Sequence, residues 1–153
     1  MEKKKIAIGC DEAAYELKET LKHHLEEKGY AVSDYGVEAG EKILYPDVAF
    51  KVAEAVADDQ FERAVLLCGT GIGVCMSANK VAGVRAAVCH DPFSAQRARK
   101  SNNAQIACFG ARIIGPELAK NLLDIWLESE FQGGGSTSKV NRITEYEQGS
   151  LKK

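Results

Sequence analysis

The chain of 153 residues carries 20 basic and 22 acidic side chains, a formal net charge of −2, so no large basic face for nucleic acid is expected. The length suits one domain, and we expect residues 1–153 to form it. Five cysteines without a Cys-x-x-Cys spacing indicate free thiols in a reducing cytoplasm. No apolar run reaches the about 18 residues that a membrane span needs. We therefore expect a cytoplasmic protein that binds neither nucleic acid nor membranes.

Apolar runs typical of strands alternate with segments of helical periodicity. In chain order, the sequence predicts a strand at 5–9, a helix through 17–25, a strand at 31–34, a loop at 36–44, a helix at 45–56, a strand at 63–67, a helix start at 74–78, a strand at 84–89, a helix at 93–100, a strand at 104–109, a helix at 116–126 and a last helix at 139–147. Gly29 and Pro46 support two of these boundaries, one as a helix stop and the other in a first helical turn.

Five apolar strands alternating with helices predict an α/β domain with a parallel sheet. Right-handed crossovers would make the sheet doubly wound and Rossmann-like, with helices on both faces and a C-terminal helix. Ligands of such folds bind at the carboxyl ends of the strands, near the switch point. Four polar or reactive side chains are predicted at those ends: Asp11, Cys68, His90 and Arg112.

The stretch from Cys68 to Gly73 is the most informative motif, because it directly follows the apolar run 64–67. Its alternating glycines, Gly69, Gly71 and Gly73, allow a sharp turn and let a ligand approach backbone N–H groups. A strand, a glycine turn and a helix start together build an anion site. A cysteine at its lip would have its thiolate favoured. This pattern predicts a base or nucleophile that faces an oxyanion.

Simpler interpretations exist for these residues. The loop lacks the Gly-x-Gly-x-x-Gly and P-loop spacings, and Val74 stands where a Cys-x5-Arg loop needs arginine, so it could be a tight turn with an inert cysteine. Asp11 could be a helix N-cap and Glu12 a first-turn carboxylate. His90 could be an acid or base, or a surface histidine. The other cysteines suggest packing, and the scattered histidines and cysteines predict neither a metal site nor a cofactor.

Seven short segments occur in an order that closely resembles one family. They are Ile8-Gly9-Cys10-Asp11, Tyr45-Pro46-Asp47, Cys68 to Gly73, Ser77-Ala78-Asn79-Lys80, Gly83-Val84-Arg85-Ala86, Ser101-Asn102-Asn103-Ala104 and Phe109-Gly110-Ala111-Arg112. With these segments the chain resembles the ribose-5-phosphate isomerase type B family, which includes galactose-6-phosphate isomerase subunits and erythrulose-4-phosphate isomerases. The match spans residues 5–148 and is most specific from Cys68 to Lys80.

The resemblance implies a metal-free aldose–ketose isomerase of a sugar phosphate, working through a cis-enediolate without a cofactor. It implies a homodimer or homotetramer with active sites at the subunit interface. Cys68 would be the base that moves a proton between C1 and C2, Thr70 would assist at a substrate hydroxyl, and the N–H groups of 69–73 would stabilise the enediolate. The sugar would be contacted by Asp11, Glu12, Tyr45, Ser101 and Asn102, and the phosphate by Arg112, Ser136 and Lys139.

The chain departs from the pentose-phosphate members of this family, which have histidine at the positions of Glu12 and Ser101 and arginines near the C-terminus, where this chain has Gly133-Gly134-Gly135-Ser136 and Lys139. The histidine at position 101 helps to open a furanose ring. A tetrose 4-phosphate has its O4 blocked and needs no such acid, and the erythrulose-4-phosphate branch of the family also has serine there. We therefore expect an enzyme that converts erythrulose 4-phosphate to erythrose 4-phosphate.

Rival interpretations remain at this point. The substrate could be ribose 5-phosphate, with His90 supplying the acid for ring opening. The protein could instead be a non-catalytic homologue that binds a sugar phosphate, although the retained Cys68, Thr70 and glycine loop argue against this. A flavin-binding, flavodoxin-like module is a third alternative, for which the loop is a poor match.

Overall fold

The computed structural model describes residues 2–149 and contains a five-stranded, all-parallel sheet in the order β2-β1-β3-β5-β4. Its strands are β1 (Lys5–Cys10), β2 (Ala31–Asp34), β3 (Ala64–Cys68), β4 (Ala86–Val88) and β5 (Ile106–Gly110). Every residue of β3 and β5 is buried, which explains why both appear as continuous apolar runs in the sequence. The predicted doubly wound α/β fold is confirmed.

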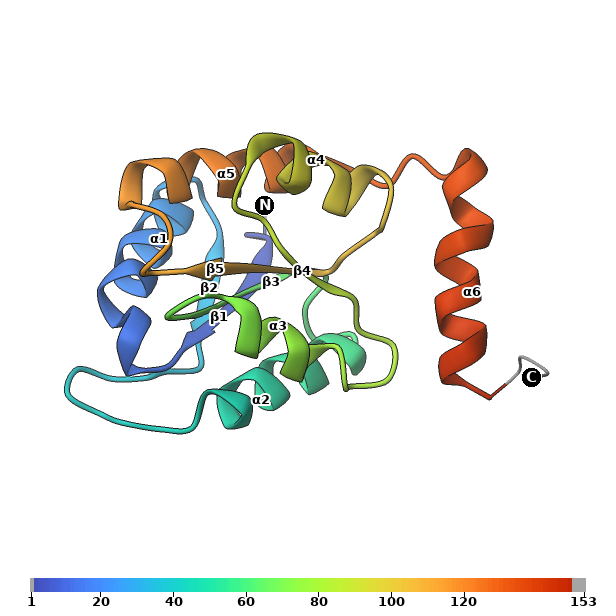
Figure 1. Ribbon diagram of the computed structural model, residues 1–153. Coiled ribbons are helices and arrows are strands. Elements are labelled where there is room, and N and C mark those ends of the chain that lie inside the picture. Colours follow the sequence, from blue (N-terminus) through green and yellow to red (C-terminus); the bar gives the residue numbers. More distant parts are fainter. Residues whose placement is uncertain (1, 150–153) are drawn as a thin grey trace.

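Helices cover both faces of the sheet (Figure 1). They are α1 (Tyr15–Glu27), α2 (Tyr45–Ala57), α3 (Ile72–Ala78), α4 (Pro92–Lys100), α5 (Pro116–Glu128) and α6 (Thr137–Glu147), with short 3-10 turns at Glu12–Ala14 and Gly134–Ser136. Helices α1, α4 and α5 pack on one face, and α2 and α3 on the other, so the sheet separates two apolar cores. The leucines predicted to line one face of the first helix, Leu17, Leu21 and Leu25, are buried in one of these cores.

Strand β4 is shorter than the predicted 84–89. The side-chain amide of Asn79 explains its start, because it accepts from the Ala86 N–H at 2.8 Å and donates to the Ala86 carbonyl at 2.9 Å. The Arg85 N–H is likewise taken by the Gln105 side chain at 2.7 Å. Side-chain hydrogen bonds thus take up backbone groups on both sides of the chain where β4 begins, which the apolar pattern could not reveal.

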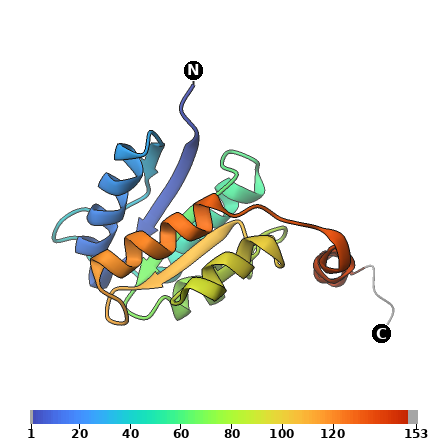
Figure 2. The same cartoon turned by 90° about the horizontal axis from the view of Figure 1, so that it is seen from above.

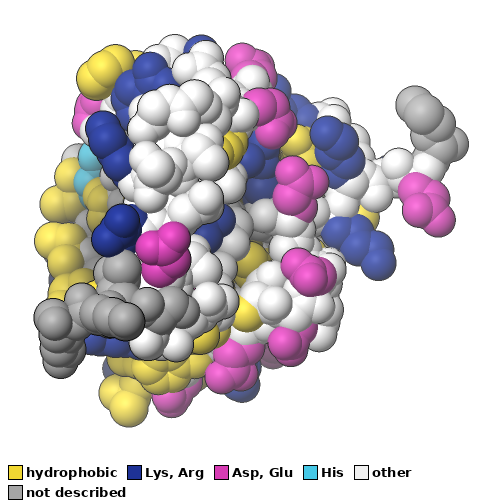
Figure 3. Space-filling model, turned by 90° about the vertical axis from the view of Figure 1, so that its right-hand side faces the viewer, with side chains coloured by type: hydrophobic (Ala, Val, Ile, Leu, Met, Phe, Trp, Pro, Cys, Tyr) yellow, Lys and Arg dark blue, Asp and Glu magenta, His cyan; other side chains and the backbone are white. Residues whose placement is uncertain are grey.

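Helix α6 lies apart from the body of the molecule (Figures 1 and 2) and begins two residues before the predicted 139. One contact with the body is the hydrogen bond from the Gly83 N–H to Glu147 Oε2 at 2.8 Å. On the face that carries α6, acidic and basic side chains are interspersed, and hydrophobic side chains gather along one margin (Figure 3). Within residues 2–149, no helix combines the length and the apolar character needed to cross a membrane.

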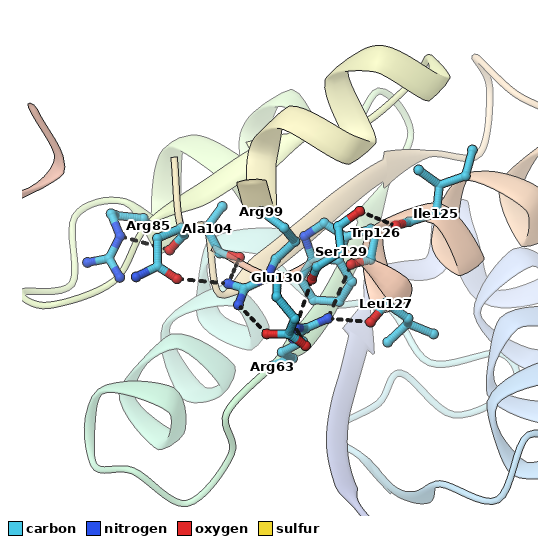
Figure 4. Close-up of polar contacts among 10 residues, drawn as sticks. Arg63, Arg85, Arg99, Ala104, Ile125, Trp126, Leu127, Ser129 and Glu130 are labelled. Atoms are coloured by element: carbon cyan, nitrogen blue, oxygen red, sulfur yellow. Dashed lines mark hydrogen bonds and ion pairs between the residues drawn. The ribbon is translucent and has the colours of Figure 1, made fainter. Parts of the chain in front are cut away.

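Buried arginines fix the point where the chain leaves α5 toward α6 (Figure 4). The Arg63 guanidinium donates to the carbonyls of Trp126 and Leu127 at 3.1 and 2.7 Å. It also donates to the Ser129 carbonyl at 3.0 Å and pairs with Glu130 at 2.6 Å. The last carbonyls of a helix have few backbone donors, and among residues 2–149 only one backbone donor, the Ser129 N–H, also reaches one of these carbonyls, that of Trp126 at 3.3 Å, so Arg63 acts as a C-terminal cap.

Candidate active site

Some of the predicted site residues meet at the carboxyl edge of the sheet. Cys68 is the last residue of β3 and is in register with Gly110 of β5. On the other side, Cys10 of β1 is in register with Leu67, which places Asp11 at the same edge. Strands β1 and β3 are neighbours although β2 lies between them in the sequence, so this edge is the switch point where ligands of such sheets bind.

The Cys68 sulfur lies beneath the glycine loop. Its Sγ accepts a hydrogen bond from the Gly71 N–H at 3.2 Å, an interaction that is stronger for a thiolate than for a thiol. Gly71 has φ +76°, a conformation that glycine adopts without strain. Cys68 is only 4 % exposed, so it lies deeper than the lip position expected from the sequence.

The loop rests directly on the end of β5. A Cβ added at Gly110 would lie 2.5 Å from the carbonyl carbon of Thr70, and one added at Gly71 would lie 2.8 Å from that of Phe109. Thr70 itself is exposed, and its Oγ1 accepts from the Ile72 N–H at 3.3 Å. Because the oxygen is the acceptor there, the hydroxyl hydrogen is free to donate to a ligand.

Tyr45 and Arg112 lie against the two ends of the loop. A Cβ on Gly73 would overlap the Tyr45 ring, so the tyrosine packs directly on this glycine. A Cβ on Gly69 would lie 3.2 Å from Arg112 Nη1, and the Arg112 N–H donates to the Gly69 carbonyl at 2.9 Å. Because Gly73 and Gly69 have no side chains, the Tyr45 phenol and the Arg112 guanidinium can pack directly against the loop.

The two acidic residues after β1 have different environments. Asp11 is half-buried and caps the following 3-10 turn, with its carboxylate accepting from the Ala13 N–H at 3.1 Å. Burial raises the pKa of the Asp11 carboxyl, and the Ala13 N–H and the positive charge of Arg112 oppose this. Glu12 is exposed, and its carboxylate accepts from the Ile43 N–H at 3.2 Å. Glu12 thus contacts the loop that leads into α2.

Four predicted site residues lie elsewhere in this chain. Ser101 and Asn102 follow α4, which returns from the carboxyl end of β4 to the start of β5. Strand β5, about 13 Å long at 3.3 Å per residue, separates them from Cys68. Ser136 and Lys139 lie at the start of α6, on the opposite side of the molecule from the β3–α3 loop (Figure 1).

Three of the four other cysteines lie in the apolar cores. Cys10, Cys89 and Cys108 are buried, as expected of packing residues. Burial raises the pKa of Cys10 to about 11 and that of Cys89 to about 12, so both stay protonated at neutral pH. Among residues 2–149, no group of three or more His, Cys, Asp and Glu side chains is arranged to hold a metal ion.

Sequence reasoning left His90 undecided and gave Gly110 no role. The structure joins them, because His90 Nε2 accepts the Gly110 N–H at 2.8 Å. In the sequence, His90 follows a predicted strand and Gly110 lies twenty residues later, and neither position indicates that the two are in contact. The contact arises only from the pairing of β4 with β5.

Comparison with known proteins agrees with this geometry. The family model described as Ribose/Galactose Isomerase matches residues 6–143. A D-erythrulose-4-phosphate isomerase of Pectobacterium atrosepticum is 57 % identical over 93 % of this chain and 94 % of its own length. A ribose-5-P isomerase B of Listeria innocua is 54 % identical over 94 % and 97 %. The solved structure of Clostridium thermocellum ribose-5-phosphate isomerase B superposes with a TM-score of 0.93 at 42 % identity, covering 96 % of this chain and 99 % of that one.

These matches define an α/β enzyme with a parallel sheet, and the chain belongs to the ribose/galactose isomerase family. It is a sugar-phosphate isomerase of the ribose-5-phosphate isomerase B type. The predicted family and reaction class are confirmed.

Proposed function

We propose that Cys68 is the base of a metal-independent aldose–ketose isomerisation. It would take the proton from the carbon next to the carbonyl, leaving a cis-enediolate, and return it to the neighbouring carbon. The observation that carries this proposal is the 3.2 Å hydrogen bond from the Gly71 N–H to Cys68 Sγ, because it stabilises the ionised sulfur that such a base requires.

The loop supplies the groups that the enediolate needs. Thr70 keeps its hydroxyl hydrogen available for a substrate oxygen, since its Oγ1 already accepts from the Ile72 N–H. The N–H groups of Gly69 and Gly73 are proposed as donors to the charge that develops on oxygen. The Gly71 N–H is directed at the sulfur instead, so this glycine serves the base rather than the enediolate.

We propose a four-carbon substrate, erythrulose 4-phosphate, converted to erythrose 4-phosphate. Ser101 supports this assignment, because a tetrose 4-phosphate needs no ring-opening acid, and so does the relative from Pectobacterium atrosepticum. Asp11, Tyr45 and Asn102 would contact the sugar, and Arg112 the phosphate. Ribose 5-phosphate is the second candidate, supported by the similar identity of the relative from Listeria innocua.

We also propose that two copies of the chain share each site. In their own chain Asn102 follows α4, and Ser136 and Lys139 lie at the start of α6, which extends away from the body of the molecule (Figure 2). Ile143 and Tyr146 are exposed on helix α6. Ile72 and Met76 are exposed on α3, which follows the proposed catalytic loop, Cys68–Gly73. Apolar side chains on an extended helix are typical of an interface between subunits, so a second copy would bring Asn102, Ser136 and Lys139 to Cys68.

The test is an assay of the full chain with erythrulose 4-phosphate and ribose 5-phosphate, each with and without a chelator. We expect faster turnover of the four-carbon sugar and no effect of chelation. Preference for ribose 5-phosphate would overturn the substrate, and loss of turnover with chelator would overturn the metal-independent mechanism.

The role of Cys68 is tested by Cys68→Ala in deuterated water. We expect the variant to bind erythrulose 4-phosphate while losing both turnover and deuterium incorporation into the sugar. Cys75→Ala, which removes a half-buried thiol in the first turn of α3, is the control and should keep both. Near-native turnover in Cys68→Ala would show that another group is the base.

A further inference from the structure

The imidazole of His90 replaces a missing strand partner next to the catalytic loop. Alternate residues of a strand direct their backbone groups to the same edge, and the Cys108 carbonyl accepts from the Cys89 N–H on the β4 side of β5. The Gly110 N–H therefore also faces β4, but β4 ends at Val88. His90 Nε2 accepts this N–H at 2.8 Å in place of a strand carbonyl.

Gly110 supports the loop that carries the proposed chemistry. Its Cα lies so close to Thr70 that a Cβ would be 2.5 Å from the Thr70 carbonyl carbon. The next two N–H groups, of Ala111 and Arg112, donate to the carbonyls of Cys68 and Gly69 at 3.0 and 2.9 Å. A displacement of Gly110 would therefore move both ends of the Cys68–Thr70 segment.

The imidazole is itself held in place as a neutral acceptor. Its ring packs against Phe109, with 6.5 Å between the ring centroids. Burial lowers the pKa of His90, while the neighbouring Asp91 carboxylate acts in the opposite direction. A neutral ring with a lone pair on Nε2 carries its proton on Nδ1, the tautomer that the bond from Gly110 requires.

We propose that His90 is a positioning residue of this isomerase, which holds Gly110 so that Thr70 and Cys68 keep their working geometry. The inference rests on the proposed roles of Cys68 and Thr70, and it gives His90 no proton transfer to the substrate. The role requires only a hydrogen-bond acceptor for the Gly110 N–H at the position of His90 Nε2. Without it the loop would shift, and a small misplacement of catalytic groups lowers the rate strongly.

The test compares two variants of the full chain. His90→Leu removes the acceptor, and we expect kcat to fall on the order of ten- to a hundredfold with little change in KM. His90→Gln restores an acceptor at similar reach and should return kcat to within about threefold of native. His23→Leu is the matched control, because the His23 side chain on α1 is 75 % exposed, and its kinetics should be native.

Two kinetic results would overturn the proposal. If His90→Gln is as slow as His90→Leu, the imidazole acts as an acid or base rather than as an acceptor. If folded His90→Leu has native kcat, Gly110 does not need this partner. Should His90→Leu fail to fold, His90→Asn takes its place, because the Asn carbonyl is too short to reach the Gly110 N–H.

Hydrogen exchange of the Gly110 amide provides a readout without substrate. We expect faster exchange in His90→Leu and native exchange in His90→Gln, with His23→Leu unchanged. Equal exchange in all variants would overturn the proposal even if kcat differs. If the native enzyme turned over no sugar phosphate while exchange behaved as expected, the proposed function would have failed and the positioning of Gly110 would stand.

Discussion

At the scale of single residues, each glycine of the loop Cys68–Gly73 allows a different close contact. Gly71 adopts a positive φ and directs its N–H to Cys68 Sγ. Gly73 admits the ring of Tyr45, and Gly69 admits the guanidinium of Arg112. The missing side chains of Gly73 and Gly69 thus allow the ring of Tyr45 and the positive charge of Arg112 to reach the loop from other elements.

Gly73→Ala should displace Tyr45 without unfolding the protein. The added Cβ would overlap the tyrosine ring, and a partly exposed side chain can swing outward. If Tyr45 contacts the sugar, we expect KM to rise about tenfold, the loss of one hydrogen bond to substrate. Gly115→Ala is the control, because no atom lies within 4 Å of its Cβ. Native KM in Gly73→Ala would remove Tyr45 from the substrate contacts.

At the scale of elements, the segment between β2 and α2 is held by a buried amine. Lys18 of α1 is 1 % exposed, and its Nζ donates to the Asp34 carboxylate at 2.9 and 3.0 Å and to the Val37 carbonyl at 2.7 Å. The burial of this ammonium ion is offset by the charge of Asp34. This contact fixes the start of the segment that ends at Tyr45.

The Lys18–Asp34 pair should make stability depend on pH. Burial acts to raise the pKa of Asp34, but hydrogen bonds from Lys18, the Gly36 N–H and Lys22 outweigh it and lower that pKa below its ordinary 3.8. The stabilisation is therefore present above pH 3.8 and is lost as pH falls through the lowered pKa.

We expect Asp34→Asn to lower the free energy of unfolding by about 1–3 kcal/mol at pH 7 and by less at pH 3, as measured by urea unfolding. Asp58→Asn, at the exposed end of α2, should match the native protein at both pH values. A deficit in Asp34→Asn that is as large at pH 3 as at pH 7 would contradict an ionic contribution.

The end of α5 depends on Arg63 in a similar way. Arg63→Ala would remove the guanidinium donor from the carbonyls of Trp126, Leu127 and Ser129. We expect a loss of about 3 kcal/mol in thermal or urea unfolding. Arg63→Lys should recover only part of it, since an ammonium group lacks the guanidinium fork. Arg142→Ala, whose side chain is 68 % exposed, should change stability by less than about 0.5 kcal/mol.

At the scale of the whole molecule, the proposal requires two copies of the chain to complete each site. One half comprises the loop and its neighbours at the carboxyl edge of the sheet. The other half comprises Asn102, which precedes β5, and Ser136 and Lys139, which lie at the start of α6 (Figure 1). Two-fold symmetry would give a dimer two equivalent sites, each built from both chains.

Mixing inactive variants tests this arrangement. Cys68→Ala and Asn102→Ala, unfolded together and refolded as a mixture, should regain about a quarter of native activity, because half of the dimers are mixed and each has one intact site. The mixture of Cys68→Ala with Thr70→Ala is the control and should stay inactive, since both residues come from the same copy. No recovery in the first mixture would assign Asn102 to its own chain's site or to none.

The sequence by itself determined the order of elements and the position of the glycine loop after β3. Buried parallel strands such as β3 and β5 are apolar throughout, so runs like 64–67 identify them, and their ends locate Asp11, Cys68 and Arg112. The segment 68–73 could also be predicted from the sequence, because its glycines are typical of a tight turn after a strand.

Only the tertiary structure decided which distant groups meet. The bond of His90 to Gly110, the burial of Lys18 beside Asp34 and the cap of Arg63 on α5 each join separate elements. A polar side chain looks the same in the sequence whether it faces water or a buried partner, because the local pattern records periodicity and turn chemistry but not which strands become neighbours. The depth of Cys68 and the separation of Asn102 from it follow from that pairing.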